Sequence, residues 1–95
     1  MLKPFYLGPH LITTPVALAP MAGVTDRPFR QLCRSFGAGY VVSEMVASDI
    51  RLWKSRKSAS RLNYQDEPAP RAIQIVGYDP QMMAEAAKAA VSDSE

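Results

Sequence analysis

Residues 16–45 read VALAPMAGVTDRPFRQLCRSFGAGYVVSEM, and this stretch decides the fold. It opens on a short apolar run at 16–19 that stops at Pro20, as expected for a strand covered on both faces. A helix-like period follows, and Gly37 is placed to end that helix. Residues 40–45 return to a β-prone composition that becomes polar at its end. The stretch therefore predicts a β-α-β unit with parallel strands.

The predicted helix rests on apolar residues at the spacing i, i+3, i+4 and i+7, which is one stripe of an amphipathic helix. The apolar stripe consists of Phe29, Leu32, Cys33 and Phe36. The opposite side of the helix consists of Arg27, Arg30, Gln31 and Arg34. Thr25 or Asp26 can cap the first turn, in which Pro28 is tolerated. Cys33 is interpreted as a structural cysteine, because it lies on the apolar stripe with no histidine nearby.

The flanking segments extend the alternation of strands and helices. β-Prone runs at 5–7 and 11–13, separated by Gly8-Pro9-His10, predict an N-terminal hairpin. Residues 71–77 predict a third strand, and a short helix is plausible within 46–66. Asp79 and Pro80 begin a further helix, whose apolar stripe is Met83, Ala86, Ala87, Ala90 and Val91.

The order of these elements gives an α/β fold class with a parallel sheet. Three parallel strands would leave both sheet edges uncovered. A closed (β/α)8 barrel needs eight units and about 250 residues. We therefore interpret residues 1–95 as one incomplete domain, a hairpin plus the first three β/α units of a truncated barrel, and do not expect it to fold well alone.

Composition excludes several classes of protein. With 47% hydrophobic and 21% charged residues and a net charge of +2, the chain is ordinary globular material. Cys33 is the only cysteine and His10 the only histidine, so we expect no disulfide and no metal centre. No run approaches the ~18 apolar residues of a membrane span, and glycine and prolines interrupt the apolar N-terminus. The sequence predicts a cytoplasmic location without membrane contact.

Ligands of parallel α/β folds bind at the carboxyl ends of the strands, where the loop at 20–23 would lie. If Ala17 and Ala19 face the barrel axis, a flat ligand fits above them, against Pro20-Met21-Ala22. A buried strand with a tight loop explains the same pattern. Glu44, at the end of the second strand, could meet a substrate or pair with a basic residue such as Arg71.

The third strand contains one polar anomaly. Alternation places Ile73 and Ile75 on the helix side and Gln74 on the opposite face, inside the barrel. A buried amide needs partners for its oxygen and its nitrogen, and each unmet group costs about 1–3 kcal/mol. Either a heterocyclic ligand or a neighbouring strand could supply them.

A basic stretch runs from Arg51 to Arg61 without an acidic residue. Its members are Arg51, Lys54, Arg56, Lys57 and Arg61. Such a patch can neutralise phosphates, and Trp53 within it could stack on a base. A solvated charged face is the other interpretation.

Residues 18–30, LAPMAGVTDRPFR, closely resemble the opening signature of the tRNA-dihydrouridine synthases. The resemblance continues in order over essentially the whole chain and fits the bacterial B-type branch. The continuing matches are Cys33, Gly37-Ala38-Gly39, Ser43-Glu44-Met45, Gln74-Ile75-Val76-Gly77 and Asp79-Pro80.

The resemblance implies an N-terminal FMN-binding TIM barrel followed by a helical tRNA-binding domain, in a monomeric enzyme. Such oxidoreductases use FMN, reduced by NADPH, to reduce the 5,6 double bond of uridines flipped out of tRNA. Hydride passes from flavin N5 to uracil C6, and a cysteine protonates C5. The family's FMN contacts carry over to Pro20, Met21, Ala22 and Gln74.

The resemblance also implies that several parts lie beyond residue 95. These are the catalytic cysteine in an Asn-x-Gly-Cys-Pro loop after the fourth strand, the late phosphate-binding loops and the helical domain. We therefore assign no catalytic residue within residues 1–95, and expect the polypeptide alone to be inactive and to bind FMN poorly or not at all. Two alternatives stay open: another FMN-dependent barrel oxidoreductase, and a non-enzymatic RNA-binding module.

Overall fold

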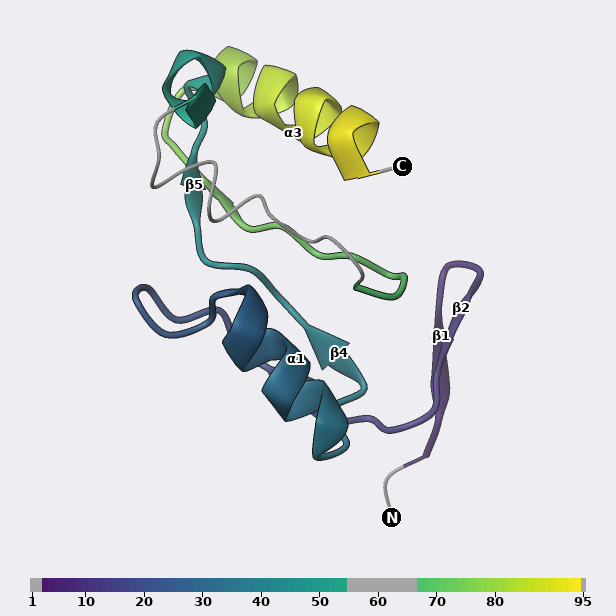
Figure 1. Cartoon of the computed structure of the whole chain (residues 1–95). Coiled ribbons are helices and arrows are strands. Elements are labelled where there is room, and N and C mark those ends of the chain that lie inside the picture. Colours follow the sequence, from purple (N-terminus) through teal and green to yellow (C-terminus); the bar gives the residue numbers. More distant parts are fainter. Residues whose placement is uncertain (1–2, 55–66, 95) are drawn as a thin grey trace.

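The structure is a computed structural model that describes residues 3–54 and 67–94 (Figure 1). Its elements follow one another as β1 (Phe5–Leu7), β2 (His10–Ile12), β3 (Ala17–Leu18), α1 (Arg27–Ser35), β4 (Tyr40–Val41), β5 (Val46–Ala47), the 3-10 helix η1 (Ile50–Lys54), β6 (Ile75–Val76) and α3 (Pro80–Ser94). This order confirms an α/β chain in which strands and helices alternate after an N-terminal hairpin.

The hairpin pairs β1 with β2 in antiparallel register. Phe5 lies opposite Ile12, and Leu7 lies opposite His10. Gly8 turns the chain with a positive φ of 58°, a conformation that glycine adopts without steric cost. The predicted hairpin is confirmed, with its second strand beginning at His10, one residue earlier than expected.

The parallel strands form short pairs around the chain segment 40–48. β3 pairs with β4, with Ala17 opposite Tyr40, and β5 pairs with β6, with Val46 opposite Ile75. A single parallel bridge between Val42 and Ala72 joins the two pairs. The predicted parallel β-α-β arrangement is thus confirmed, although each strand is shorter than the sequence indicates. The prediction that residues 16–19 are covered on both faces is wrong here, because Val16, Ala17 and Ala19 are exposed.

A bulge interrupts the strand that was predicted over residues 40–45. The Ser43 N–H donates to the Ala72 carbonyl at 3.0 Å, and the Val46 N–H donates to the Gln74 carbonyl at 2.9 Å. The segment from Ser43 to Val46 therefore has one more residue than the segment opposite it. An extra residue of this kind bends a strand and re-aims its side chains. Here it places Glu44 so that its carboxylate binds the Gly23 N–H in the loop that follows β3.

Both ends of α1 are set by local signals that the sequence contains. The Asp26 carboxylate accepts from the Phe29 N–H at 3.0 Å, which caps the first turn. Gly37 follows the last turn with a φ of 108°, and the Ala38 N–H reaches back to the Cys33 carbonyl at 3.0 Å. That geometry is the glycine-terminated ending the sequence predicts.

The prediction for the faces of α1 is wrong for Arg30. The pattern places Arg30 opposite the apolar stripe, yet this residue is only 2% exposed. Phe36, which belongs to the stripe, is 85% exposed, and Leu32 is exposed as well. Arg30 tolerates burial because the Glu67 carboxylate compensates its charge at 2.6 Å. A pairing partner distant in sequence therefore overrides the helical pattern.

The main apolar cluster lies beneath α3. Val46, Trp53 and Ala86 are buried, and partly buried neighbours pack on them: Ile73, Ile75, Ala89 and Ala90. The Trp53 indole N–H donates to the Ala47 carbonyl at 2.6 Å. Trp53 is therefore a core residue, and the prediction that it could stack on a base is wrong. No helix within residues 3–54 and 67–94 is long and apolar enough to span a membrane.

Gly39→Ala is expected to lower the free energy of unfolding by about 1–3 kcal/mol, the usual cost of overpacking. A Cβ at this position would collide with the Thr14 backbone carbonyl and crowd the Ile12 side chain. Urea unfolding of a longer protein that contains these residues measures the effect. Lys88→Ala, on the exposed part of α3, is the control and should change stability by less than about 0.5 kcal/mol. Equal unfolding midpoints for the two variants would contradict the prediction.

Candidate functional site

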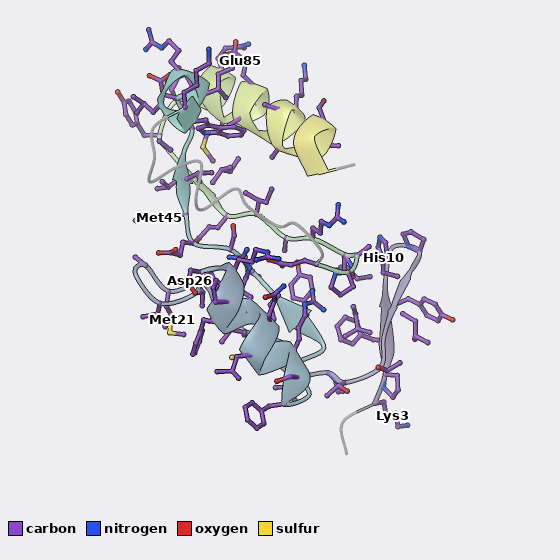
Figure 2. The ribbon with its side chains drawn as sticks, viewed as in Figure 1. Lys3, His10, Met21, Asp26, Met45 and Glu85 are labelled. Carbon is purple, nitrogen blue, oxygen red and sulfur yellow. The ribbon has the colours of Figure 1, made fainter. Side chains whose placement is uncertain are left out.

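The loop after β3 closes into a tight turn around the Met21 carbonyl. That oxygen accepts from the Val24 and Thr25 N–H groups, each at 3.0 Å. The Thr25 hydroxyl donates to the same oxygen at 3.1 Å and accepts from the Met21 N–H at 2.8 Å. Thr25 is 0% exposed, so its hydroxyl is held inside the turn. Figure 2 places Met21 on this loop, beside Asp26 at the start of α1.

The turn is tied to the strand bulge through Gly23. The Gly23 N–H donates to Oε1 of Glu44, whose side chain is largely buried. Gly23 has a φ of 77°, which a residue with a Cβ would adopt only with strain. The sequence predicts Glu44 as either a substrate contact or an ion-pair partner, and the structure adds a third role, because the Glu44 carboxylate also anchors the loop backbone at Gly23.

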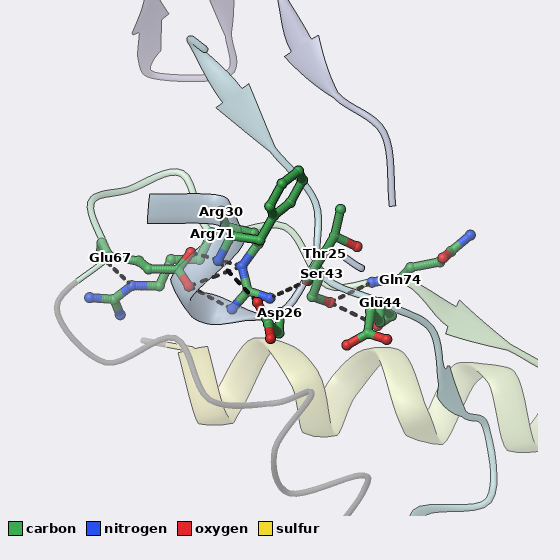
Figure 3. Close-up of polar contacts among 9 residues, drawn as sticks. Thr25, Asp26, Arg30, Ser43, Glu44, Glu67, Arg71 and Gln74 are labelled. Carbon is green, nitrogen blue, oxygen red and sulfur yellow. Dashed lines mark hydrogen bonds and ion pairs between the residues drawn. The ribbon is translucent and has the colours of Figure 1, made fainter. Parts of the chain in front are cut away.

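A buried ion pair holds the far end of the same turn. Nη1 of Arg30 donates to the Thr25 carbonyl at 2.8 Å. Nε and Nη2 of Arg30 donate to Oε1 of Glu67, at 3.0 and 2.6 Å. The two side chains are 2% and 4% exposed, so water screens the pair little. Figure 3 shows the resulting row of contacts from Glu67 through Arg30 to the turn.

Gln74, directly before β6, also contacts the strand bulge. The Gln74 N–H donates to Oγ of Ser43 at 3.3 Å, next to Glu44. Ile73 and Ile75 pack toward α3, whereas the Gln74 side chain is exposed and extends away from that helix (Figure 3). The predicted alternation is therefore confirmed, whereas the predicted burial of the Gln74 amide is wrong for these residues, because no described segment covers that face. Gly23 of the loop after β3 contacts Glu44, and Gln74 contacts the adjacent Ser43.

A single backbone donor of this turn has no partner among the residues that the structure describes. From residue 21 to residue 26, the paired N–H groups are those of Met21, Gly23, Val24, Thr25 and Asp26. The Ala22 N–H is the exception, and Ala22 is exposed. Pro20 has no N–H to offer. The predicted loop therefore presents one amide donor, from Ala22, together with the half-exposed Met21 thioether.

Sequence reasoning missed the residues that shape this loop. The sequence predicts Thr25 only as a candidate helix cap and gives no role to Glu67. The spacing of Thr25 from Met21 is typical of a hydroxyl that closes a short turn, and this signal was available. No local pattern connects Arg30 with Glu67, because the two residues lie far apart in sequence.

Elsewhere, the described residues give little support to a second site. In the basic stretch, Arg51 pairs with Asp49 at 2.7 Å, and its hydrogen bond lowers the pKa of the Asp49 carboxyl below its usual value. Arg56, Lys57 and Arg61 lie outside the described residues. Within residues 3–54 and 67–94, no three acidic, histidine or cysteine side chains are grouped to hold a metal ion.

Comparison with known proteins places the chain in a family. The dihydrouridine synthase (Dus) family model matches residues 17–95. The chain is 63% identical to tRNA-dihydrouridine synthase B of Pseudomonas aeruginosa over 82 residues, which cover 86% of the chain and 25% of that protein. It is 60% identical to the protein of the same name from Pseudomonas syringae over 85 residues, or 90% of the chain and 25% of that relative.

A more distant relative, tRNA-dihydrouridine synthase B of Vibrio vulnificus, is 48% identical over 87 residues, covering 92% of the chain and 27% of the relative. No solved structure matches the chain. The chain spans about a quarter of the length of these relatives. With a family model that covers all but the N-terminal hairpin region, the chain belongs to the dihydrouridine synthase family.

Proposed function

We propose that this chain forms part of a flavin-dependent tRNA-dihydrouridine synthase and supplies two edges of its FMN site. One edge is the loop Pro20-Met21-Ala22, and the other is Gln74. The observation that carries the proposal is that the Gly23 N–H, directly after Ala22, binds Glu44 while the Gln74 N–H binds the adjacent Ser43, with Ala22 and the Gln74 side chain both exposed. Relatives at 48–63% identity are named tRNA-dihydrouridine synthase B.

The residues present fit an isoalloxazine ring. Its edge carries several hydrogen-bonding atoms, and the site offers a donor at Ala22 together with a donor and an acceptor at the Gln74 amide. The Met21 thioether is a polarizable group suited to the face of a flat ring. When bound, the flavin would supply the hydride that reduces the 5,6 double bond of a tRNA uridine, after its own reduction by NADPH. The residues of this chain would bind and orient the ring.

The proton donor of the reaction is expected from outside these 95 residues. Cys33 is the only cysteine of the chain, and it lies half-buried on α1, in the wall of a groove of about 460 Å³ beside β3. Cys33 lies on the helix and not on the loop that would contact the ring, and we propose that the 95-residue polypeptide alone does not form dihydrouridine. The TIM barrel, the helical tRNA-binding domain, the monomeric state and the cytoplasmic location belong to the same proposal.

The alternative of a non-enzymatic RNA-binding module loses two of its supports. Trp53 is buried in the core rather than presented for stacking, and Arg51 is paired with Asp49. An FMN-dependent barrel enzyme acting on a small molecule shares the proposed cofactor edges and differs only in substrate. The product of the reaction therefore separates the two enzymatic candidates.

A chimera tests the proposal. In it, these residues replace the aligned segment of the Pseudomonas aeruginosa relative, and it is produced in a bacterial strain without its own dihydrouridine synthases. We expect purified chimera to carry FMN and to restore dihydrouridine in tRNA, as measured by mass spectrometry of nucleosides. The unaltered relative is the positive control. A chimera that binds FMN but reduces only small pyrimidines would favour the alternative enzyme, and one that folds without binding FMN would contradict the proposal.

A further inference from the structure

We propose that Thr25 is a positioning residue that aims the Ala22 N–H at an acceptor atom of the bound cofactor. The inference rests on the proposed function and adds a specific role for residues that have none in it. It follows from the hydrogen bonds of the turn at residues 21–25 and from the planarity of one peptide unit.

The direction of the Ala22 N–H is fixed by its own peptide plane. The Met21 carbonyl and the Ala22 N–H belong to the same planar, trans unit, in which the C=O and N–H bonds point in opposite directions. Three donors converge on the Met21 oxygen inside the turn: the Val24 N–H, the Thr25 N–H and the Thr25 hydroxyl. Because the oxygen points into the turn, the Ala22 N–H points out of it.

Thr25 contributes to this arrangement through both functions of its hydroxyl. As a donor it holds the Met21 oxygen at 3.1 Å, and as an acceptor it holds the Met21 N–H at 2.8 Å. Both peptide units that flank Met21 are therefore fixed by one fully buried side chain. Loss of the hydroxyl would leave the Met21 N–H without its partner and would remove one of the three donors that hold the Met21 oxygen, which loosens the peptide between residues 21 and 22.

Three further residues anchor the turn from outside. Glu44 binds the Gly23 N–H, which leaves Ala22 as the donor of the loop. Arg30 binds the Thr25 carbonyl at 2.8 Å and is itself held by Glu67. The turn is thus held from the strand bulge and from α1, and a ligand meets a donor that is already oriented. Preorganisation of this kind strengthens binding by reducing the ordering that association requires.

The test compares two substitutions at one position in the chimera. Thr25→Val keeps the shape of the side chain and removes the hydroxyl, whereas Thr25→Ser keeps the hydroxyl. Titration of the apoprotein with FMN, followed by fluorescence, should give a Kd about 5- to 30-fold higher for Thr25→Val, corresponding to one or two lost hydrogen bonds. For Thr25→Ser we expect a change of less than about threefold. Ser35→Ala, which removes an exposed hydroxyl hydrogen bond on α1, is the control and should leave the Kd unchanged.

Amide hydrogen exchange of the apoprotein separates this inference from the proposed function, since it needs no cofactor. We expect slow exchange at the paired amides of Met21, Gly23 and Val24 and fast exchange at Ala22. In Thr25→Val, the Met21 amide should lose its protection while amides of α3 keep theirs, which shows that the fold persists.

Equal FMN affinity of the parent and both variants would overturn the positioning role, and so would an equal loss in Thr25→Val and Thr25→Ser. Slow exchange at Ala22 would overturn the orientation of its N–H. If the parent chimera folds with the expected exchange pattern but does not bind FMN, the proposed function fails, and the cofactor role of Thr25 fails with it.

Discussion

Arg30→Ala in the chimera is expected to lower the free energy of unfolding by about 3–5 kcal/mol, which is the usual cost of removing one partner of a buried ion pair. Arg30 donates to Glu67 at 2.6 Å, and both side chains are almost fully buried. The substitution would leave the Glu67 carboxylate in the interior without the arginine that donates to both of its oxygens. It would also remove the donor to the Thr25 carbonyl. Urea unfolding followed by circular dichroism measures the loss.

Two controls separate these effects. Arg51→Ala removes the arginine of the exposed pair with Asp49 and should change stability little, because solvent screens that pair. The double variant Arg30→Met, Glu67→Leu removes both buried charges and should recover most of the stability lost in Arg30→Ala. Its affinity for FMN should stay reduced, because the Thr25 carbonyl still lacks its donor. Similar unfolding midpoints for Arg30→Ala and Arg51→Ala would contradict the assignment of a buried, stabilising pair.

Gln74→Leu in the chimera is expected to weaken FMN binding about 10- to 100-fold. An apolar side chain of similar size cannot pair with the polar edge of the ring, and a ligand group left unpaired on desolvation costs about 1–3 kcal/mol. Stability should change little, because the Gln74 side chain is exposed and extends away from α3. Fluorescence titration with FMN and urea unfolding measure the two quantities.

Gln81→Leu is the matched control for this prediction. Gln81 is an exposed glutamine of α3 whose amide contacts Glu85 at 3.3 Å, remote from the loop after β3. Its replacement should leave the FMN affinity unchanged. Equal affinities of Gln74→Leu and the parent would remove Gln74 from the proposed cofactor site.

The sequence predicts those parts of the fold that depend on neighbouring residues. Asp26 caps α1 three residues before the N–H that it binds, and Gly37 ends the helix through its own positive φ. The hairpin is set by the glycine and proline between its strands. In each case the side chain and its partner lie within a few positions of one another, so the printed sequence contains the whole interaction.

The parts that could not be predicted depend on residues distant in sequence. The bulge after Ser43 follows from pairing with the segment at 72–74, which no pattern within residues 40–45 reveals. Arg30 fits the polar side of an amphipathic helix as long as Glu67 is ignored, and the pair becomes visible only in three dimensions. Trp53 lies in a basic stretch that resembles a nucleic-acid contact, but its indole is buried against α3.

The candidate site likewise has features that the sequence predicts and features that it does not. The face of Gln74 could be predicted. Ile73 and Ile75 identify the helix side of the strand, and because successive side chains alternate, Gln74 must lie on the opposite side. The partner of Glu44 could not be predicted, since a carboxylate at a strand end fits a substrate, a cation or a backbone amide equally well. In the structure the Glu44 carboxylate accepts from the backbone amide of Gly23, a residue with positive φ in the loop after β3.

The central proposal is that the loop after β3 and Gln74, directly before β6, contact two edges of one flavin ring. A crystal structure of the chimera with FMN tests it most directly. We expect the Ala22 N–H and the Gln74 amide to lie within about 3.2 Å of polar atoms of the isoalloxazine, with the Thr25 hydroxyl still on the Met21 backbone. A flavin bound in the chimera with its ring away from both Ala22 and Gln74 would contradict the proposal.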